Sequence, residues 1–108
     1  MRYRVVSGQA DWRKYLAASF VVRQAICDDI RRLGGAIVSG DHRHVEVWNP
    51  ANPRGDIAPN LIVEIRADAL EIEDLGGHDG RLMDAVRELM GVWRKRYVID
   101  DLRIEECG

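Results

Sequence analysis

The chain has 108 residues, which is long enough for one domain with its own hydrophobic core and too short for two. Hydrophobic residues make up 46% of it and charged residues 31%, a balance that excludes intrinsic disorder. The formal net charge of −2 argues against nucleic acid as a partner. The longest apolar stretch, residues 17–22, is too short to span a bilayer, and the first residues lack the apolar region of a secretory signal. We therefore expect one cytoplasmic domain, residues 1–108, without a membrane partner.

Two cysteines are too few for the disulfide framework of a small secreted domain. Cys27 falls within an expected helix, and Cys107 lies in the last four residues, 105–108, which we expect to fray. A bridge between the two cysteines stays an alternative, because the sequence does not give their separation. Reduced thiols in a cytoplasmic protein are the favoured interpretation.

The first half of the chain predicts one strand, one long helix and a hairpin. Residues 2–6 are typical of a short strand. Asp11 is placed to cap a helix that runs to about residue 33, where two glycines stop it. Residues 36–39 and 44–48 then form two strands joined by a turn at residues 40–43. The apolar positions of the helix recur every three or four residues and form one stripe that suits a sheet: Trp12, Leu16, Phe20, Ile26, Ile30 and Leu33.

A stiffened loop and a second alternating segment follow. All three prolines of the chain lie within residues 49–59. Residues 61–75 alternate in hydrophobicity until the pattern shifts by one residue near positions 68 and 69. A turn there makes a hairpin in which Ile65 faces Ile72 and Arg66 faces Glu71. A single bulged strand is the alternative.

The last third of the chain predicts a second helix and a final strand. Asp79 is placed to cap a helix over residues 81–95, and residues 98–99 and 102–104 supply a strand or a strand pair. The order β-α-β-β-β-β-α-β predicts an α+β fold. We expect a two-layer sandwich with one mostly antiparallel sheet of five to six strands and two helices on one face.

A cluster of potential metal ligands lies in residues 41–46, Asp-His-Arg-His-Val-Glu. On an extended strand His42, His44 and Glu46 share one face at intervals of two residues. Imidazole and carboxylate groups at this spacing can share a zinc, nickel or iron ion, with Asp41 or His78 as a further ligand. The alternative is a turn built by His42 and a solvated strand face with His44 and Glu46. No cofactor other than such a divalent metal is expected.

The expected hairpin also gathers charge, in Glu64, Arg66, Glu71 and Glu73. Two close carboxyl groups raise one another's pKa and can serve as acid and base. The expected register sets Glu64 against Glu73, which is unfavourable unless a cation lies nearby. Alternating charge is equally typical of the solvated face of a strand.

Two tryptophans suit a binding surface. Trp48 stands at the entrance of the proline loop, so a partner interface or pocket rim would use Trp48, Pro50, Pro53 and Arg54. Trp93 opens the run Trp-Arg-Lys-Arg-Tyr, which suits phosphate or stacked bases, although cations there also match the helix dipole. Trp93 would also line a ligand pocket between helices and sheet, together with Trp12 and Tyr15. The alternative for each tryptophan is burial in the core.

The chain as a whole resembles the orphan single-domain proteins encoded on integron gene cassettes and similar mobile elements. The resemblance rests on its size, its compact α+β pattern, its lack of family motifs and its arginine bias, since fourteen of its sixteen basic residues are arginine. It implies a bacterial cytoplasmic protein that acts as a binding or accessory module. No single residue carries it, so no site is transferred.

These patterns favour an interaction module that acts as a homodimer and binds a protein partner or a small molecule, as immunity-type and antitoxin-type proteins do. The second face of the sheet is expected to be apolar, through Trp48, Ile62, Ala69 and Leu75, and a twin copy would cover it. A small metal-assisted enzyme that uses His44, Glu46 and Glu64 is the alternative.

Overall fold

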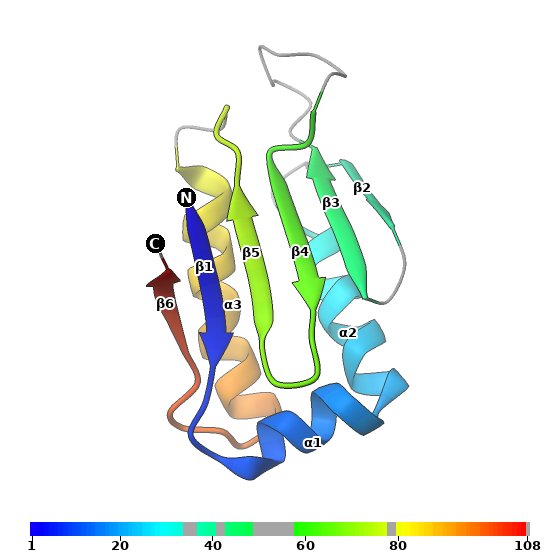
Figure 1. Cartoon of the computed structure of the whole chain (residues 1–108), viewed down its shortest axis with the longest axis vertical. Helices are drawn as coiled ribbons and strands as arrows, with labels where there is room; N and C mark the ends of the chain where they lie inside the picture. Colours follow the sequence, from blue (N-terminus) through cyan, green and yellow to red (C-terminus); the bar gives the residue numbers. More distant parts are fainter. Residues whose placement is uncertain (34–36, 41–42, 49–57, 78–79, 108) are drawn as a thin grey trace.

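The computed structural model describes residues 1–33, 37–40, 43–48, 58–77 and 80–107 (Figure 1). Its six strands form one sheet in the order β2-β3-β4-β5-β1-β6, and every neighbouring pair is antiparallel. The predicted α+β class is therefore confirmed. The strands are β1 (Arg2–Val6), β2 (Ile37–Gly40), β3 (His44–Trp48), β4 (Leu61–Ile65), β5 (Leu70–Asp74) and β6 (Arg103–Cys107).

Three helices cover one face of this sheet: α1 (Ala10–Ala18), α2 (Phe20–Arg31) and α3 (Arg81–Arg96). Figure 1 shows α2 behind β3 and β4, α3 behind β5 and β1, and α1 across the end of the sheet. The core lies between the two layers, where strand residues such as Val5, Val63 and Leu70 meet Trp12, Ile26 and other helix residues. Within the described part of the chain, no helix is long and apolar enough to cross a membrane.

The expectation of one long first helix was wrong, because the chain breaks at Ser19. The amide of Ser19 donates to the carbonyl of Tyr15 and ends α1, while the Ser19 hydroxyl accepts from the amide of Val22 and caps α2. The buried Arg23 side chain donates to the carbonyl of Leu16 at 2.6 Å. This carbonyl lies in the last turn of α1, where carbonyl groups have no partner within the helix. The break changes the helical phase, so Phe20 is 54% exposed and does not continue the core stripe.

The first helix also begins differently from the prediction. α1 starts at Ala10 with Gln9 as its N-cap, so Asp11 lies in the first turn and not at the cap. A carboxylate in the first turn still interacts favourably with the positive end of the helix dipole. The second predicted helix is confirmed over residues 81–96, and its N-cap is Gly80, whereas Asp79 lies outside the described residues.

The hairpin of residues 61–75 is confirmed, but its register differs from the predicted one by two residues. Ile65 pairs with Leu70 and Val63 with Ile72, so the connection spans residues 66–69. The longer connection lets the amide of Arg66 donate to the carbonyl of Ala69 at 2.9 Å and close the turn. As a result Glu64 lies opposite Glu71 instead of Glu73.

Residues 105–107 belong to a strand, contrary to the expected fraying, whereas residue 108 lies outside the described residues. Residues 103–107 form β6, which pairs with β1 along its whole length, and residues 98–99 are not a strand. Asp101 holds this end in place, since it accepts a hydrogen bond from Ser7 Oγ at 2.5 Å and one from the Gly8 amide at 2.8 Å. These two bonds lower the pKa of Asp101. The two cysteines do not form the alternative disulfide bridge, since Cys27 lies in the core and Cys107 lies half-buried on β6.

A buried carboxylate joins the two sheet-covering helices. Asp29 of α2 accepts from Trp93 Nε1 at 2.7 Å and from Arg96 at 2.5 Å, and both donors belong to α3. This hydrogen bond to Asp29 raises the pKa of Arg96, so the guanidinium stays charged. Trp93 is fully buried in this arrangement, which places it in the core and not on a binding surface.

Replacing the Asp29 carboxylate should therefore destabilise the fold. We predict that Asp29→Ala lowers the free energy of unfolding by about 2–4 kcal/mol, because the Trp93 N–H and one side of Arg96 lose their partner. Urea denaturation measures the effect. Asp28→Ala is the matched control in the same helix, where an exposed ion pair with Arg31 contributes about 0.5 kcal/mol or less. Equal losses in the two variants would contradict a special role for Asp29.

Candidate functional site

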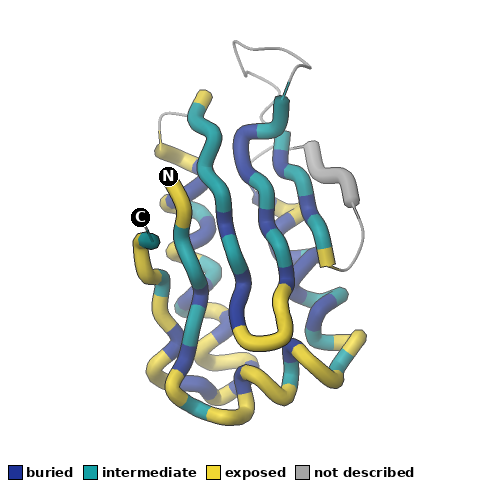
Figure 2. The backbone as a smooth tube through the Cα atoms, in the orientation of Figure 1, coloured by how far each residue is buried: buried dark blue, intermediate teal, exposed yellow. Residues whose placement is uncertain are grey.

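No described helix or strand covers the face of the sheet opposite the helices, and the outward residues of its strands are mostly half-buried (Figure 2). The strand registers arrange these outward side chains in two rows that run across the sheet. The first, called the Glu64 row, contains His44, Glu64, Glu71, Arg4 and Glu105. The second, called the Ile62 row, contains Glu46, Ile62, Glu73, Arg2 and Cys107.

This face corrects one expectation from the sequence. Of the four residues expected to make it apolar, Ile62 and Trp48 do lie on it, whereas Ala69 is completely buried. Leu75 lies beyond the end of β5. Charged side chains occupy most positions of both rows. Among the described residues the open face is therefore mainly polar, and it lacks the continuous apolar area on which a face-to-face homodimer was predicted.

His44 is held between two carboxylates. Its Nδ1 atom lies 2.8 Å from Glu64 Oε1, and its Nε2 atom lies 3.6 Å from Glu46 Oε2. The hydrogen bond to Glu64 is the main reason why the pKa of His44 is raised above 6.5, and the negative charge of both glutamates adds to it. The geometry therefore stabilises the imidazolium form relative to the neutral ring.

Arg66 compensates the repulsion between two carboxylates that face each other. Glu64 and Glu71 are directly opposite on neighbouring strands, an arrangement that is unfavourable by itself. Arg66 in the turn lies 3.9 Å from Glu64 Oε2 and 3.4 Å from Glu71 Oε2. The predicted opposition of Glu64 and Glu73 does not occur, and the cation that such a pair would need lies instead beside Glu64 and Glu71.

β1 adds two arginines to the same face. Arg4 reaches Asp68 in the hairpin turn at 3.5 Å, and its Nε atom is buried with no hydrogen-bond partner among the described residues. Arg2 lies opposite Glu73 of β5 and Cys107 of β6. Neither Arg2 nor Glu73 forms an ion pair with a residue in the described part of the chain.

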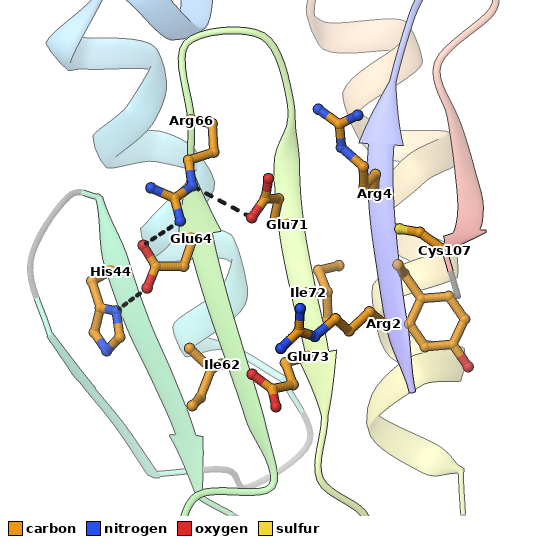
Figure 3. Close-up of a pocket in the computed structure, with 11 residues that line it drawn as sticks. Arg2, Arg4, His44, Ile62, Glu64, Arg66, Glu71, Ile72, Glu73 and Cys107 are labelled. Atoms are coloured by element: carbon orange, nitrogen blue, oxygen red, sulfur yellow. Dashed lines mark hydrogen bonds and ion pairs between the residues drawn. The ribbon is translucent and has the colours of Figure 1, made fainter.

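These side chains surround a shallow pocket of about 560 Å³ (Figure 3). Its volume is that of a small-molecule site. Figure 3 shows Arg4 of β1 on one side of it, the His44–Glu64–Arg66 network on the other, and Arg2 extending from β1 toward Glu73. The lining side chains that the site uses are Arg2, Arg4, His44, Ile62, Glu64, Arg66, Glu71, Glu73 and Cys107.

The structure brings together only part of the residues predicted from the sequence. His44 and Glu46 share the open face with Glu64, Glu71 and Glu73, and Trp48 lies half-buried on the same face without lining the pocket. His42, Pro50, Pro53 and Arg54 lie outside the described residues. Trp93 and Trp12 are completely buried, so the alternative of burial in the core is confirmed for these two tryptophans.

The predicted metal cluster is represented by two of its three ligands, His44 and Glu46. Across the described ranges, no group of three histidine, cysteine or acidic side chains is arranged to hold a metal ion.

The basic run of residues 93–97 makes contacts within the fold, because Arg94 donates to the carbonyl of Leu102 and Arg96 donates to Asp29. These contacts agree with the alternative in which the cations at this helix end stabilise the fold.

Sequence reasoning missed Arg2 and Arg4. Their alternation in residues 2–6 places them on one face of a strand, which was the only available signal. Nothing local connects that strand to the hairpin, which lies about sixty residues further along the chain. Only the pairing of β1 with β5 brings the arginines to Glu71 and Glu73.

No protein-family model matches the chain, and neither a curated protein nor a solved structure matches it significantly. The resemblance to proteins of integron cassettes therefore stays a prediction. The geometry of the open face is therefore the basis for assigning a function.

The raised pKa of His44 predicts a pH dependence. The folded state holds the proton more tightly than the unfolded chain, so the His44–Glu64 pair stabilises the fold fully below pH 6.5 and loses this contribution as the pH rises through the folded pKa. NMR titration of the His44 ring should give a pKa above 6.5 that returns toward 6.5 in Glu64→Gln. Because His44 is 42% exposed, the effect on stability is small. An unchanged pKa in the variant would contradict this assignment.

Proposed function

We propose that the protein is a non-catalytic binding module whose ligand lies in the pocket on the open face of the sheet. The observation that carries this proposal is the asymmetry of the sheet. Three helices cover one face, while the other holds a pocket lined by charged residues of β1, β4 and β5, by His44 of β3 and by Cys107 of β6. The chemistry of the lining favours a small ligand with charged groups, because guanidinium and carboxylate groups recognise opposite charge directionally.

A polar ligand suits this face better than a second copy of the chain. The centres of protein interfaces are depleted of charged residues, and burial of ion pairs such as His44–Glu64 carries a desolvation cost. The homodimer expected from the sequence stays a prediction, and it would need another surface. A site on the open face is compatible with a partner protein only if that partner supplies charges that match the two rows.

Binding is also favoured over covalent catalysis. The pocket contains one thiol, Cys107 on β6, and one imidazole, His44 on β3. Three strands, β4, β5 and β1, separate these two groups in the sheet. A nucleophile and its base must lie within hydrogen-bonding distance of one another, so this pair does not form a catalytic dyad.

An NMR screen tests the proposal. Free amino acids, polyamines, dicarboxylates and nucleoside phosphates would be added singly to the ¹⁵N-labelled protein. We expect at least one compound to shift amide signals of β1, β4 and β5 in a saturable way and to be recovered unchanged.

The matched variants are Arg4→Gln in the pocket and Arg13→Gln on the exposed side of α1. Only Arg4→Gln should weaken the shifts. Shifts confined to the helices, or consumption of the compound, would contradict a binding module on the open face.

A divalent metal site at His44 is the second candidate, supported by one specific observation. Metal-bound histidines typically donate their other ring N–H to a carboxylate, which fixes the ring orientation. Glu64 is placed for this role at Nδ1, while Nε2 faces Glu46, so that Nε2 and the Glu46 carboxylate can hold an ion together. The proton on His44 competes with the metal, so affinity would rise with pH.

A thermal-shift titration of the chelator-treated protein with zinc, nickel, manganese and iron tests this candidate. A native-state site gives a saturable rise in melting temperature, because ligand binding stabilises by mass action. The rise should disappear in His44→Ala and persist in the control Arg13→Gln. A flat response with all four metals would exclude the metal site.

A further inference from the structure

We infer that the pocket binds the charged head group of a free aliphatic α-amino acid, with its carboxylate on Arg2 and its ammonium group on Glu73. This inference rests on the proposed function of the open face. It names the ligand class and the two residues that recognise it.

Ion pairs are distributed unevenly over the pocket. Arg4 pairs with Asp68, His44 and Arg66 pair with the glutamates of β4 and β5 in the Glu64 row, and the last member of that row, Glu105, pairs with Arg103. Arg2 and Glu73 are the exceptions, since neither has an ion pair among the described residues although they lie opposite each other on β1 and β5. One cation and one anion are therefore available to a ligand at adjacent positions.

The spacing of the two strands also matches the spacing of the charged groups in an α-amino acid. Neighbouring strands lie about 4.8 Å apart, so Arg2 and Glu73 present opposite charges side by side. An α-amino acid carries its carboxylate and ammonium group on one carbon atom and can contact both strands. Arg4 adds positive charge on the same face two residues along β1.

The pocket also offers an apolar contact for the side chain of the ligand. Ile62 follows Glu73 in the Ile62 row and lines the pocket as an apolar residue on the open face. An amino acid held at Arg2 and Glu73 would place an aliphatic side chain over Ile62. A peptide end fits less well, since an N-terminus carries only the ammonium group and a C-terminus only the carboxylate.

Isothermal titration with three probes tests the inference: L-leucine, N-acetyl-L-leucine, which lacks the ammonium charge, and L-leucinamide, which lacks the carboxylate. We expect saturable binding of L-leucine with a dissociation constant of about 1 mM or below. Each blocked analogue should bind at least about tenfold more weakly, because one charged hydrogen bond is lost.

Two pocket variants assign the contacts. Arg2→Gln should weaken L-leucine about tenfold and leave L-leucinamide unaffected, whereas Glu73→Gln should weaken L-leucine and leave N-acetyl-L-leucine unaffected. Arg13→Gln and Glu88→Gln, both exposed on helices, are the matched controls and should bind like the parent protein. Unchanged melting temperatures show that the variants are folded.

Three outcomes would overturn the inference: no saturable binding of L-leucine, equal binding of all three probes, or equal effects of pocket and control variants. If L-leucine fails while another compound of the NMR screen shifts the open-face amides, the ligand class is wrong and the binding module stands. If no compound shifts those amides, the proposed function fails as well.

Discussion

In a sheet whose neighbouring strands are all antiparallel, a residue that faces the helices forces both of its chain neighbours onto the opposite face. Burial of Val5, Val63 and Ile72 against the helices therefore turns Arg4, Glu64 and Glu71 outward together. The same pairs that build the core also align the charges into rows. The same pairing of strands therefore determines both the packing of the core and the composition of the open face.

The open face carries unfavourable charge as well as favourable charge. Glu64 and Glu71 face each other, and the fold tolerates them because His44 and Arg66 supply positive charge from β3 and from the turn. No such compensation joins Arg2 to Glu73 among the described residues. The charges of the Glu64 row are thus paired within the protein, whereas Arg2 and Glu73 are the pocket charges that lack an ion pair with a described residue.

The helix layer stays on one face because its own connections are specific. Ser19 ends one helix and caps the next within a single residue, which turns α2 along the sheet after α1 has crossed its end. Asp29 then links α2 to α3 through Trp93 and Arg96. Since both helices are held against the same face, nothing in the described structure covers the charged rows.

Local patterns in the sequence were sufficient for most elements. Hydrophobic alternation identified the strands at residues 2–6, 44–48 and 61–75, and three- to four-residue spacing identified the helices. Local patterns failed where a competing hydrogen bond decided the outcome. The break at Ser19 depends on side-chain capping, and the hairpin register depends on a four-residue connection that alternation alone does not distinguish from a two-residue turn.

By itself, the sequence determined the α+β class, the order of elements and the alternation that puts the glutamates of residues 64–73 on one face. Only the tertiary structure decided that Arg2 and Arg4 join those glutamates and that Trp93 is core. It also decided that the second sheet face is charged instead of apolar. The physical reason is that periodicity acts over a few residues, whereas the pairing of β1 with β5 and β6 depends on packing between distant segments.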